Sequence, residues 1–268
     1  MMSLSKLQKF KADGVRFSCL TCYDASMAKA MQLAGIDSIL IGDSLGMTIQ
    51  GHDSTLPVSV QDMVYHTQAV RRGNQYAFII TDLPFMSYST LPDAIQSAKR
   101  VMQAGAQMVK LEGGAWLADT VRVLAQGGIP SCVHMGLTPQ SVNVFGGYKI
   151  QAKTREAADR LLADCQAVVD AGASMLLLEC VPTQVAKEVQ ARFAVPVIGI
   201  GAGVDCDGQV LVVQDMLGLN FDKPARFVRN FMEGQQGGNQ IVDAMKSFHR
   251  AVRDRDYPAP EHTFQIEL

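Results

Sequence analysis

The feature that most constrains the fold of this chain is a regular alternation of short apolar runs with longer amphipathic stretches. Eight apolar runs occur at residues 17–21, 38–41, 78–81, 108–111, 131–134, 175–178, 197–200 and 209–213. Helical stretches lie between most of them, at 26–34, 60–72, 92–104, 117–126, 155–171 and 184–193. Strands that alternate with helices predict a parallel sheet, and strands apolar throughout predict cover on both faces.

We therefore predict an α/β fold, a (β/α)8 TIM barrel with long βα loops and an extra C-terminal helix. Eight strands complete a barrel, and 268 residues suit its usual size of roughly 250. A doubly wound sheet is the alternative, but charged residues end at least four strands instead of meeting at one switch point. No linker interrupts the sequence, so we expect one domain over 1–268, with an N-terminal helical segment (1–15) and a C-terminal helix and tail (239–268). We expect residues 257–262 to form an extended tail that packs on a neighbouring subunit.

Composition excludes several classes of protein. A hydrophobic content of 48% and a net charge of -2 predict a folded enzyme with a large core and no nucleic-acid partner. No apolar run approaches the roughly 20 residues that span a bilayer, and residues 1–10 lack a signal-peptide core, so we expect no membrane partner and a cytoplasmic location. The segment Cys19-Leu-Thr-Cys22 has the spacing of redox and zinc sites. No second pair completes it, and we interpret these cysteines as structural.

Charged side chains stand at the ends of three of these runs. Asp43 and Asp82 follow the second and third runs, and Lys110 and Glu112 lie two residues apart in the fourth. Spacing of two places Lys110 and Glu112 on the same side of a strand. Carboxylates gathered at one barrel mouth repel one another, and a hard cation such as Mg²⁺ offsets this, with Lys110 compensating further. Each Asp alone is equally well explained as a helix cap, but capping does not explain two charges inside a strand.

Glu179 stands apart from this group, after three consecutive leucines. Apolar surroundings make a carboxylate a stronger base, so we interpret Glu179 as a general base. The alternative is a capping or ion-paired Glu, since Pro182 suits a helix start. His134 ends the fifth run, and its sequence position is compatible both with donating to a substrate oxygen and with bracing the site.

Three glycine-rich segments follow strand candidates. The segments 42–57 and 134–149 are long, and loops of that length in a compact domain usually cover or form a site. The third runs from Gly199 to Gly203 after the seventh strand candidate. Its glycines fit two interpretations equally, phosphate binding by backbone N–H groups and close packing at a tight turn.

These loops resemble one known family over residues 17–221. The matching strings are Asp43-Ser-Leu-Gly-Met-Thr-Ile-Gln-Gly-His-Asp-Ser-Thr-Leu-Pro57, Lys110-Leu-Glu-Gly-Gly114, Gly136-Leu-Thr-Pro-Gln-Ser141, Phe145-Gly-Gly-Tyr-Lys149 and Ile198-Gly-Ile-Gly-Ala-Gly203. They closely resemble the ketopantoate hydroxymethyltransferases. The strings are long, so this signal is far more specific than a single glycine pattern.

The resemblance implies a Mg²⁺-dependent barrel enzyme of pantothenate and coenzyme A biosynthesis. It would transfer a hydroxymethyl group from 5,10-methylenetetrahydrofolate to the small 2-oxo acid 3-methyl-2-oxobutanoate, through an enolate stabilised by Mg²⁺, and form 2-dehydropantoate (ketopantoate). It also implies a homodecamer of two stacked five-membered rings. The residue roles that it implies are Asp43, Asp82 and Glu112 as metal ligands, Asp43, Ser44, Asp82 and Lys110 as substrate contacts, and Glu179 as proton acceptor.

Two other functions remain open at this point. One is a Mg²⁺-dependent 2-oxo acid lyase or mutase of the isocitrate lyase and phosphoenolpyruvate mutase type, which shares strand-end acidic residues but lacks the Phe-Gly-Gly-Tyr-Lys and Gly-His-Asp-Ser-Thr-Leu-Pro strings. The other is a non-catalytic module that binds metal or folate. Lys110 and Glu179 beside the carboxylates argue against a module without catalysis.

Overall fold

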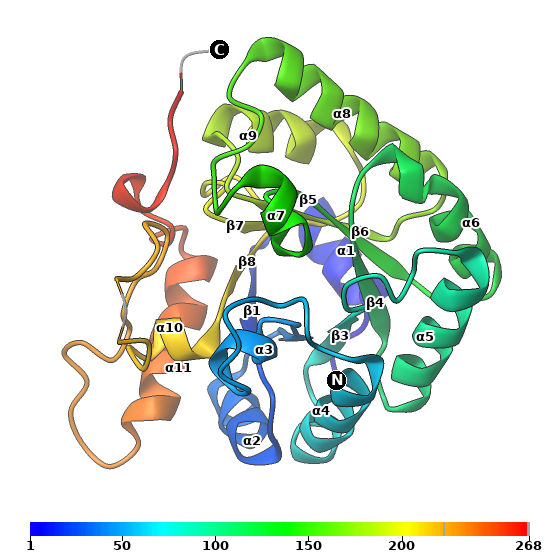
Figure 1. Ribbon diagram of the computed structural model, residues 1–268. Coiled ribbons are helices and arrows are strands. Elements are labelled where there is room, and N and C mark those ends of the chain that lie inside the picture. Colours follow the sequence, from blue (N-terminus) through cyan, green and yellow to red (C-terminus); the bar gives the residue numbers. More distant parts are fainter. Residues whose placement is uncertain (222, 267–268) are drawn as a thin grey trace.

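A computed structural model describes residues 1–221 and 223–266. All eight expected strands form, and they pair in parallel and in sequence order to close a barrel (Figure 1). The strands are β1 (Phe17–Thr21), β2 (Ser38–Ile41), β3 (Phe78–Asp82), β4 (Met108–Glu112), β5 (Ser131–Gly136), β6 (Met175–Glu179), β7 (Val197–Ile200) and β8 (Gly208–Leu211). The predicted (β/α)8 barrel is confirmed. Two strands shift by two residues at their C-terminal ends. The fifth extends to Gly136, and the eighth ends at Leu211 because Val213 begins a short helix.

Long helices surround the barrel as an outer ring (Figure 1). They are α2 (Ala25–Ala34), α4 (Val60–Gly73), α5 (Leu91–Gln103), α6 (Ala118–Gln126), α8 (Arg155–Asp170), α9 (Thr183–Arg192) and α11 (Gln240–Arg253). Four of them begin at a side chain that accepts a hydrogen bond from a backbone N–H of the first turn, namely Asp24, Ser59, Thr90 and Thr154. Such caps fix where each βα loop ends and its helix starts.

Side chains alternate between two apolar cores. Phe17 and Cys19 of β1 point into the barrel, whereas Leu20 and Cys22 pack between strands and helices. Because Cys19 and Cys22 lie in different cores, they cannot form one site. All six cysteines are free and buried, which confirms their structural interpretation.

The N-terminal end of the barrel is closed by α1 (Leu4–Ala12). Leu7 of this helix is fully buried in the core inside the barrel, among residues of several strands. The opposite end carries the short helices of the βα loops, α3 (Leu45–Thr48), η1 (Ala115–Leu117), η2 (Pro139–Ser141), α7 (Val142–Phe145) and α10 (Val213–Met216). In Figure 1, α3 and α7 lie in front of the strands and α1 lies behind them. The loops long enough to form a site therefore lie at the C-terminal mouth of the barrel.

The tail after α11 differs from the expected extended segment. It contains the 3-10 turn η3 (Pro260–His262), and Tyr257 is buried against Phe231 and Phe248. The backbone N–H of Thr183 donates to the carbonyl of Phe264, 3.0 Å away. The expectation of a wholly extended tail is wrong because Tyr257 and its aromatic neighbours anchor the segment on its own barrel; packing on a neighbouring subunit stays a prediction. Among the described residues no helix has the length and apolarity needed to cross a membrane.

Candidate active site

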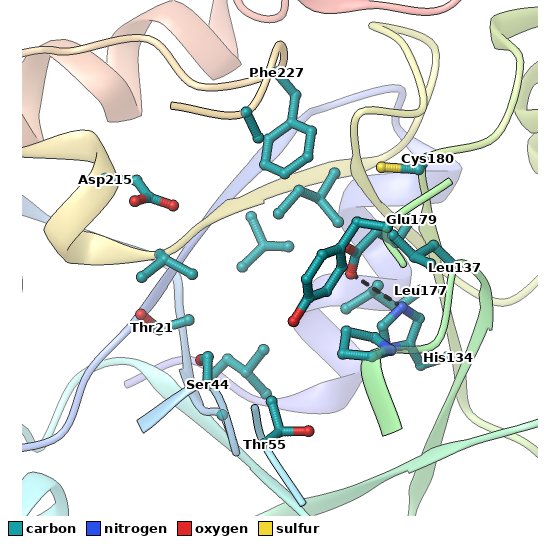
Figure 2. A pocket seen from close by; sticks show the side chains of 18 of the residues that line it. Thr21, Ser44, Thr55, His134, Leu137, Leu177, Glu179, Cys180, Asp215 and Phe227 are labelled. Carbon is teal, nitrogen blue, oxygen red and sulfur yellow. Dashed lines mark ion pairs between the residues drawn. The ribbon is translucent and has the colours of Figure 1, made fainter. Parts of the chain in front are cut away.

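One cavity of about 600 Å³ opens at the C-terminal mouth of the barrel (Figure 2). Every site residue expected from the sequence lines it: Asp43, Ser44, Asp82, Lys110, Glu112, His134 and Glu179. These side chains come from the ends of β2 to β6, so the expectation that separate strands converge on one face is confirmed. The structure brings the residues together, and their individual roles stay predictions.

Lys110 occupies the centre of the charged group. Its Nζ lies 3.0 Å from Asp82 Oδ1, 3.6 Å from Glu112 Oε1 and 3.3 Å from His134 Nδ1. Burial lowers the pKa of Lys110, but the neighbouring carboxylates, Asp82 first, outweigh it and raise that pKa well above its usual value. Lys110 is therefore a buried side chain that keeps its positive charge.

The three expected metal carboxylates differ in how well the chain compensates them. Burial raises the pKa of Asp43 well above its usual range, and repulsion from Asp82 and Glu112 raises it further. Burial also raises the pKa of Asp82, against the opposing charge of Lys110. Burial acts the same way on Glu112, but His134 and Lys110 outweigh it and lower the pKa of Glu112. Positive charge therefore compensates Asp43 and Asp82 only in part, although Lys110 pairs with Asp82, whereas it compensates Glu112 fully.

The unsatisfied groups of Asp43 and Asp82 suit a hard cation. Asp82 Oδ1 is buried without a hydrogen-bond partner, and its 3.0 Å contact with Lys110 is an ion pair that is not aligned as a hydrogen bond. The backbone N–H of Asp43 donates to Asp82 Oδ2 at 3.0 Å, which keeps the two residues adjacent. Within the described residues, no three His, Cys, Asp or Glu side chains already stand as a complete ligand set. Mg²⁺ is commonly held by one or two carboxylates with water and substrate oxygens, so this pair fits it.

Glu179 lies at the edge of the same group. Its Oε2 is 3.3 Å from His134 Nε2, and its side chain is 14% exposed against 4% or less for Lys110, Glu112 and His134. Burial and the charge of Lys110 lower the pKa of His134, but attraction to Glu112 and Glu179 outweighs them and raises it to about 9. His134 therefore contacts the Glu179 carboxylate from the buried side of the site. Glu179 thus lies where a base is expected and is also ion-paired, as the alternative interpretation predicted.

Gln140 is a site residue that the sequence reasoning missed. Its Nε2 donates to Asp43 Oδ2 at 2.8 Å and to the carbonyl of Leu83 at 3.0 Å. Its backbone N–H donates to Glu112 Oε2 at 2.9 Å, and its Oε1 accepts from the Tyr88 hydroxyl at 2.6 Å. Gln140, on the loop after β5, thus holds Asp43 through its side chain and Glu112 through its backbone N–H. It lies within the string Gly136-Leu-Thr-Pro-Gln-Ser141, but no local pattern gives it a role because its partners are distant in the chain.

Tyr23 is a second missed residue. Its hydroxyl lies 2.8 Å from the Ser44 Oγ, and its backbone carbonyl is 2.6 Å from His66 Nδ1. Because α4 carries His66, the first helix after the Ser44 loop holds Tyr23 in place. The hydroxyl of Ser44, expected as a substrate contact, is thereby oriented by Tyr23, which follows β1, although Ser44 itself follows β2.

The glycines after β7 are explained by packing. A Cβ on Gly201 would lie 2.9 Å from the ring of Phe227, and one on Gly203 would lie 2.6 Å from Thr183. Both positions also have a positive φ, which disfavours other residues. The turn therefore needs glycine whether or not a phosphate binds there.

The chain is similar to proteins of known activity over its whole length. The model of the ketopantoate hydroxymethyltransferase family matches residues 1–260. The chain belongs to the ketopantoate hydroxymethyltransferase family. A curated 3-methyl-2-oxobutanoate hydroxymethyltransferase of Acinetobacter baylyi is 73% identical over 269 residues, covering 100% of both chains. One from Psychrobacter sp. is 56% identical and covers 98% of this chain and 100% of its own. The expected enzyme class is confirmed.

Solved structures with the same fold carry other activities. A crystal structure of phosphonopyruvate hydrolase with oxalate and Mg²⁺ has a TM-score of 0.63 at 12% identity and covers 97% of this chain and 100% of its own. One of 2,3-dimethylmalate lyase, a member of the PEP mutase/isocitrate lyase superfamily, has a TM-score of 0.60 at 16% identity, with 82% and 83% covered. At these identities the likeness establishes the fold only.

Proposed function

We propose that the chain transfers a hydroxymethyl group from 5,10-methylenetetrahydrofolate to 3-methyl-2-oxobutanoate, with Mg²⁺ held in the barrel mouth, and forms 2-dehydropantoate. Family membership supports the acid and the reaction. The observation that carries the mechanism is the contact of Glu179, at the pocket edge, with the buried His134 and, through it, with Glu112. A base beside a fixed positive charge is what proton removal next to a carbonyl requires.

The residues of the chain divide the work between binding and proton transfer. The ammonium group of Lys110 binds the oxygens of the 2-oxo acid, and the Ser44 hydroxyl, held by Tyr23, supplies a further contact. Glu179 accepts the proton from C3 of the acid, and His134 keeps the carboxylate oriented during that step. Negative charge then develops on the keto oxygen, where Lys110 stabilises it. C3 then forms a bond to the one-carbon unit, both C–N bonds of that unit to the folate break, and one water supplies the hydroxyl group. The proton taken by Glu179 and the second proton of the water end on the freed nitrogens of tetrahydrofolate.

Asp43, Asp82 and Glu112 would hold Mg²⁺. Of the three, Glu112 already has both oxygens in contact with the protein, one with the backbone N–H of Gln140 and one with His134. When bound, the ion would add to the positive charge that stabilises the developing enolate. Two observations support this placement: the raised pKa values of Asp43 and Asp82, and the lack of an aligned hydrogen bond at Asp82 Oδ1, which is ion-paired with Lys110.

Deuterium exchange tests this function directly. Incubated in D₂O with Mg²⁺ and 3-methyl-2-oxobutanoate but without folate, the enzyme should exchange the C3 proton, and full turnover should require 5,10-methylenetetrahydrofolate. A lyase or mutase would instead cleave or rearrange other 2-oxo acids, and a module that only binds would catalyse no exchange. Absence of both exchange and folate-dependent turnover would contradict the proposal.

The assembly and location remain part of the same proposal. The family resemblance supports a homodecamer of two stacked five-membered rings in the cytoplasm. Sedimentation equilibrium measures the assembly directly, and a mass other than that of ten chains would reject it.

A further inference from the structure

The cavity is larger than the 2-oxo acid requires. At about 600 Å³ it falls in the range of roughly 300–1,000 Å³ that holds drug-sized ligands, whereas the acid has only five carbons. The charged group around Lys110 occupies one side of this space. In Figure 2, Asp215 lies across the pocket from Glu179 and His134, and Phe227 lies on the side between them. We call the part of the lining that carries Asp215 and Phe227 the second wall. Nothing in the proposed proton transfer uses that wall.

Asp215 is a carboxylate on this second wall that forms no ion pair with the described residues. It lies on α10, is partly buried, and within the described residues makes one side-chain hydrogen bond, from Asn220 Nδ2 to its Oδ1 at 2.9 Å, and no ion pair. Burial raises the pKa of Asp215, and the hydrogen bond from Asn220 opposes that rise. An under-compensated carboxylate that lines a cavity is suited to a ligand with N–H donors.

Phe227 presents a fixed aromatic surface beside Asp215. The Tyr257 hydroxyl donates to its backbone carbonyl at 2.6 Å, and Gly201 lies against its ring. Farther out, the exposed Arg226 lines the same wall, where its guanidinium lies 5.6 Å from the ring centroid of Phe264. The wall therefore offers an inner acceptor, a flat apolar face and an outer cation.

We propose that this wall is the folate site, with Asp215 binding the N–H edge of the reduced pterin, Phe227 packing on its ring and Arg226 facing the glutamate carboxylates. The assignment rests on the proposed function, since it takes the donor to be a folate. The two neighbouring N–H groups of a 2-amino-4-oxo pterin match the two oxygens of one carboxylate, a bidentate and charge-assisted pairing. The wall faces the base, so a one-carbon unit bound there is presented to the acid between them.

The direction of the change in folate affinity, when the negative charge of Asp215 is removed, tests this proposal. Folate is an anion, so removal of a negative charge from its site should tighten its binding if Asp215 acted only through the electrostatic field. Loss of a hydrogen-bond acceptor should weaken it. Asp215→Asn keeps the size of the side chain and replaces one acceptor oxygen with a donor, so the two possibilities predict opposite changes.

The experiment measures KM for both substrates in wild type, Asp215→Asn, Phe227→Leu and the control Asp119→Asn, an exposed acid on α6. For Asp215→Asn we expect KM for 5,10-methylenetetrahydrofolate to rise roughly 10- to 100-fold, with less than about a threefold change for the acid. Phe227→Leu should raise the folate KM several-fold, and Asp119→Asn should change neither constant. Calorimetry with tetrahydrofolate checks the same order in binding.

Each outcome decides the proposal. A folate KM that falls or stays constant in Asp215→Asn overturns it, as does an equal rise for both substrates, which would indicate a general disturbance of the mouth. If Asp215→Asn does not fold, the same comparison in Phe227→Leu and Asp215→Glu decides instead. Wild-type enzyme without folate-dependent turnover would reject the proposed function itself, which is a distinct result.

Discussion

The two ends of the barrel both contain buried carboxylates, but the chain treats them differently. At the N-terminal end, Asp207 accepts from Lys11 Nζ at 2.8 Å and from the backbone N–H of Val197 at 2.9 Å through Oδ2, and from Gln190 Nε2 at 2.7 Å through Oδ1. Asp37 is likewise engaged, since Arg253 donates to its Oδ1 at 2.7 Å. Both acids precede strands and tie them to helices.

At the C-terminal mouth the same residue type is left incomplete. Asp82 Oδ1 and His134 Nε2 are buried and make ion pairs with Lys110 and Glu179 but no aligned hydrogen bond, and the pKa of Asp43 is raised by burial first and by neighbouring carboxylates second. Buried polar groups that are satisfied only in part are costly, so Asp43 and Asp82 give up stability that Asp207 and Asp37 retain. Burial is common to all four acids, and the completeness of their hydrogen bonds and charge compensation differs.

The largest expected effect is on chemistry at the mouth. Glu179→Gln keeps the size of the side chain but removes the proton acceptor, so turnover and C3 deuterium exchange should both fall by about 10² to 10⁴. Binding of Mg²⁺ and the 2-oxo acid, measured by calorimetry, should persist. If exchange stayed at the wild-type rate while turnover fell, another group would be the base, with His134 the first candidate.

Next in size is the loss of a metal ligand. Asp82→Ala should lower Mg²⁺ affinity by about 100-fold or more, because loss of even an outer partner typically costs about 10- to 100-fold. Glu112→Ala should have a smaller effect, since Gln140 and His134 already hold the Glu112 oxygens. Calorimetric affinities that are unchanged in Asp43→Ala, Asp82→Ala and Glu112→Ala would eliminate these residues as ligands.

The matching change at the other end should affect stability instead. Asp207→Asn leaves the charges of Lys11 and Arg16 uncompensated at side chains only 11% and 10% exposed. Breaking a buried pair this way should lower the free energy of unfolding by about 3 kcal/mol, measured by urea denaturation. We expect the kcat of the folded protein to remain within about twofold. A large loss of kcat with normal stability would show that Asp207 is a functional acid and contradict the distinction between the two ends.

The smallest expected effect concerns Gln140. Gln140→Leu removes the donor to Asp43 Oδ2 and should weaken Mg²⁺ binding by about tenfold. Tyr88→Phe, which removes only the hydroxyl that orients the amide, should change it less. Equal losses of thermal stability in both variants without any change in Mg²⁺ affinity would make this pair purely structural.

Much of this contrast was accessible from sequence, and its decisive part was not. The eight strands follow from their apolar runs, and the spacing of Lys110 and Glu112 correctly placed both in one mouth. Local pattern cannot reveal that Gln140 reaches Asp43, because no periodicity links residues on different strand loops. Asp82 ends an apolar strand and Asp207 precedes one, which already places them at opposite ends of the barrel. Only the folded contacts show which of their oxygens are satisfied.

The folded tail has the same origin. The sequence around Tyr257 does not predict that its ring contacts Phe231 and Phe248, because those contacts depend on where α11 ends relative to the barrel. The short helices of the long loops were missed for a similar reason. Segments of four residues, such as α3 and α7, gain little from helix propensity and are stabilised by what they cover.

The return of the tail to the barrel has a consequence for how the protein matures. Phe264 lines the cavity, and its carbonyl is bound by the backbone N–H of Thr183. During synthesis all eight strands leave the ribosome before Phe264 does, so the barrel can close while one wall of its cavity is still missing. A nascent chain that has already folded would therefore not yet be competent to bind both substrates. Replacement of Phe264 would therefore alter the substrate cavity, although this residue lies far from the catalytic strands in sequence.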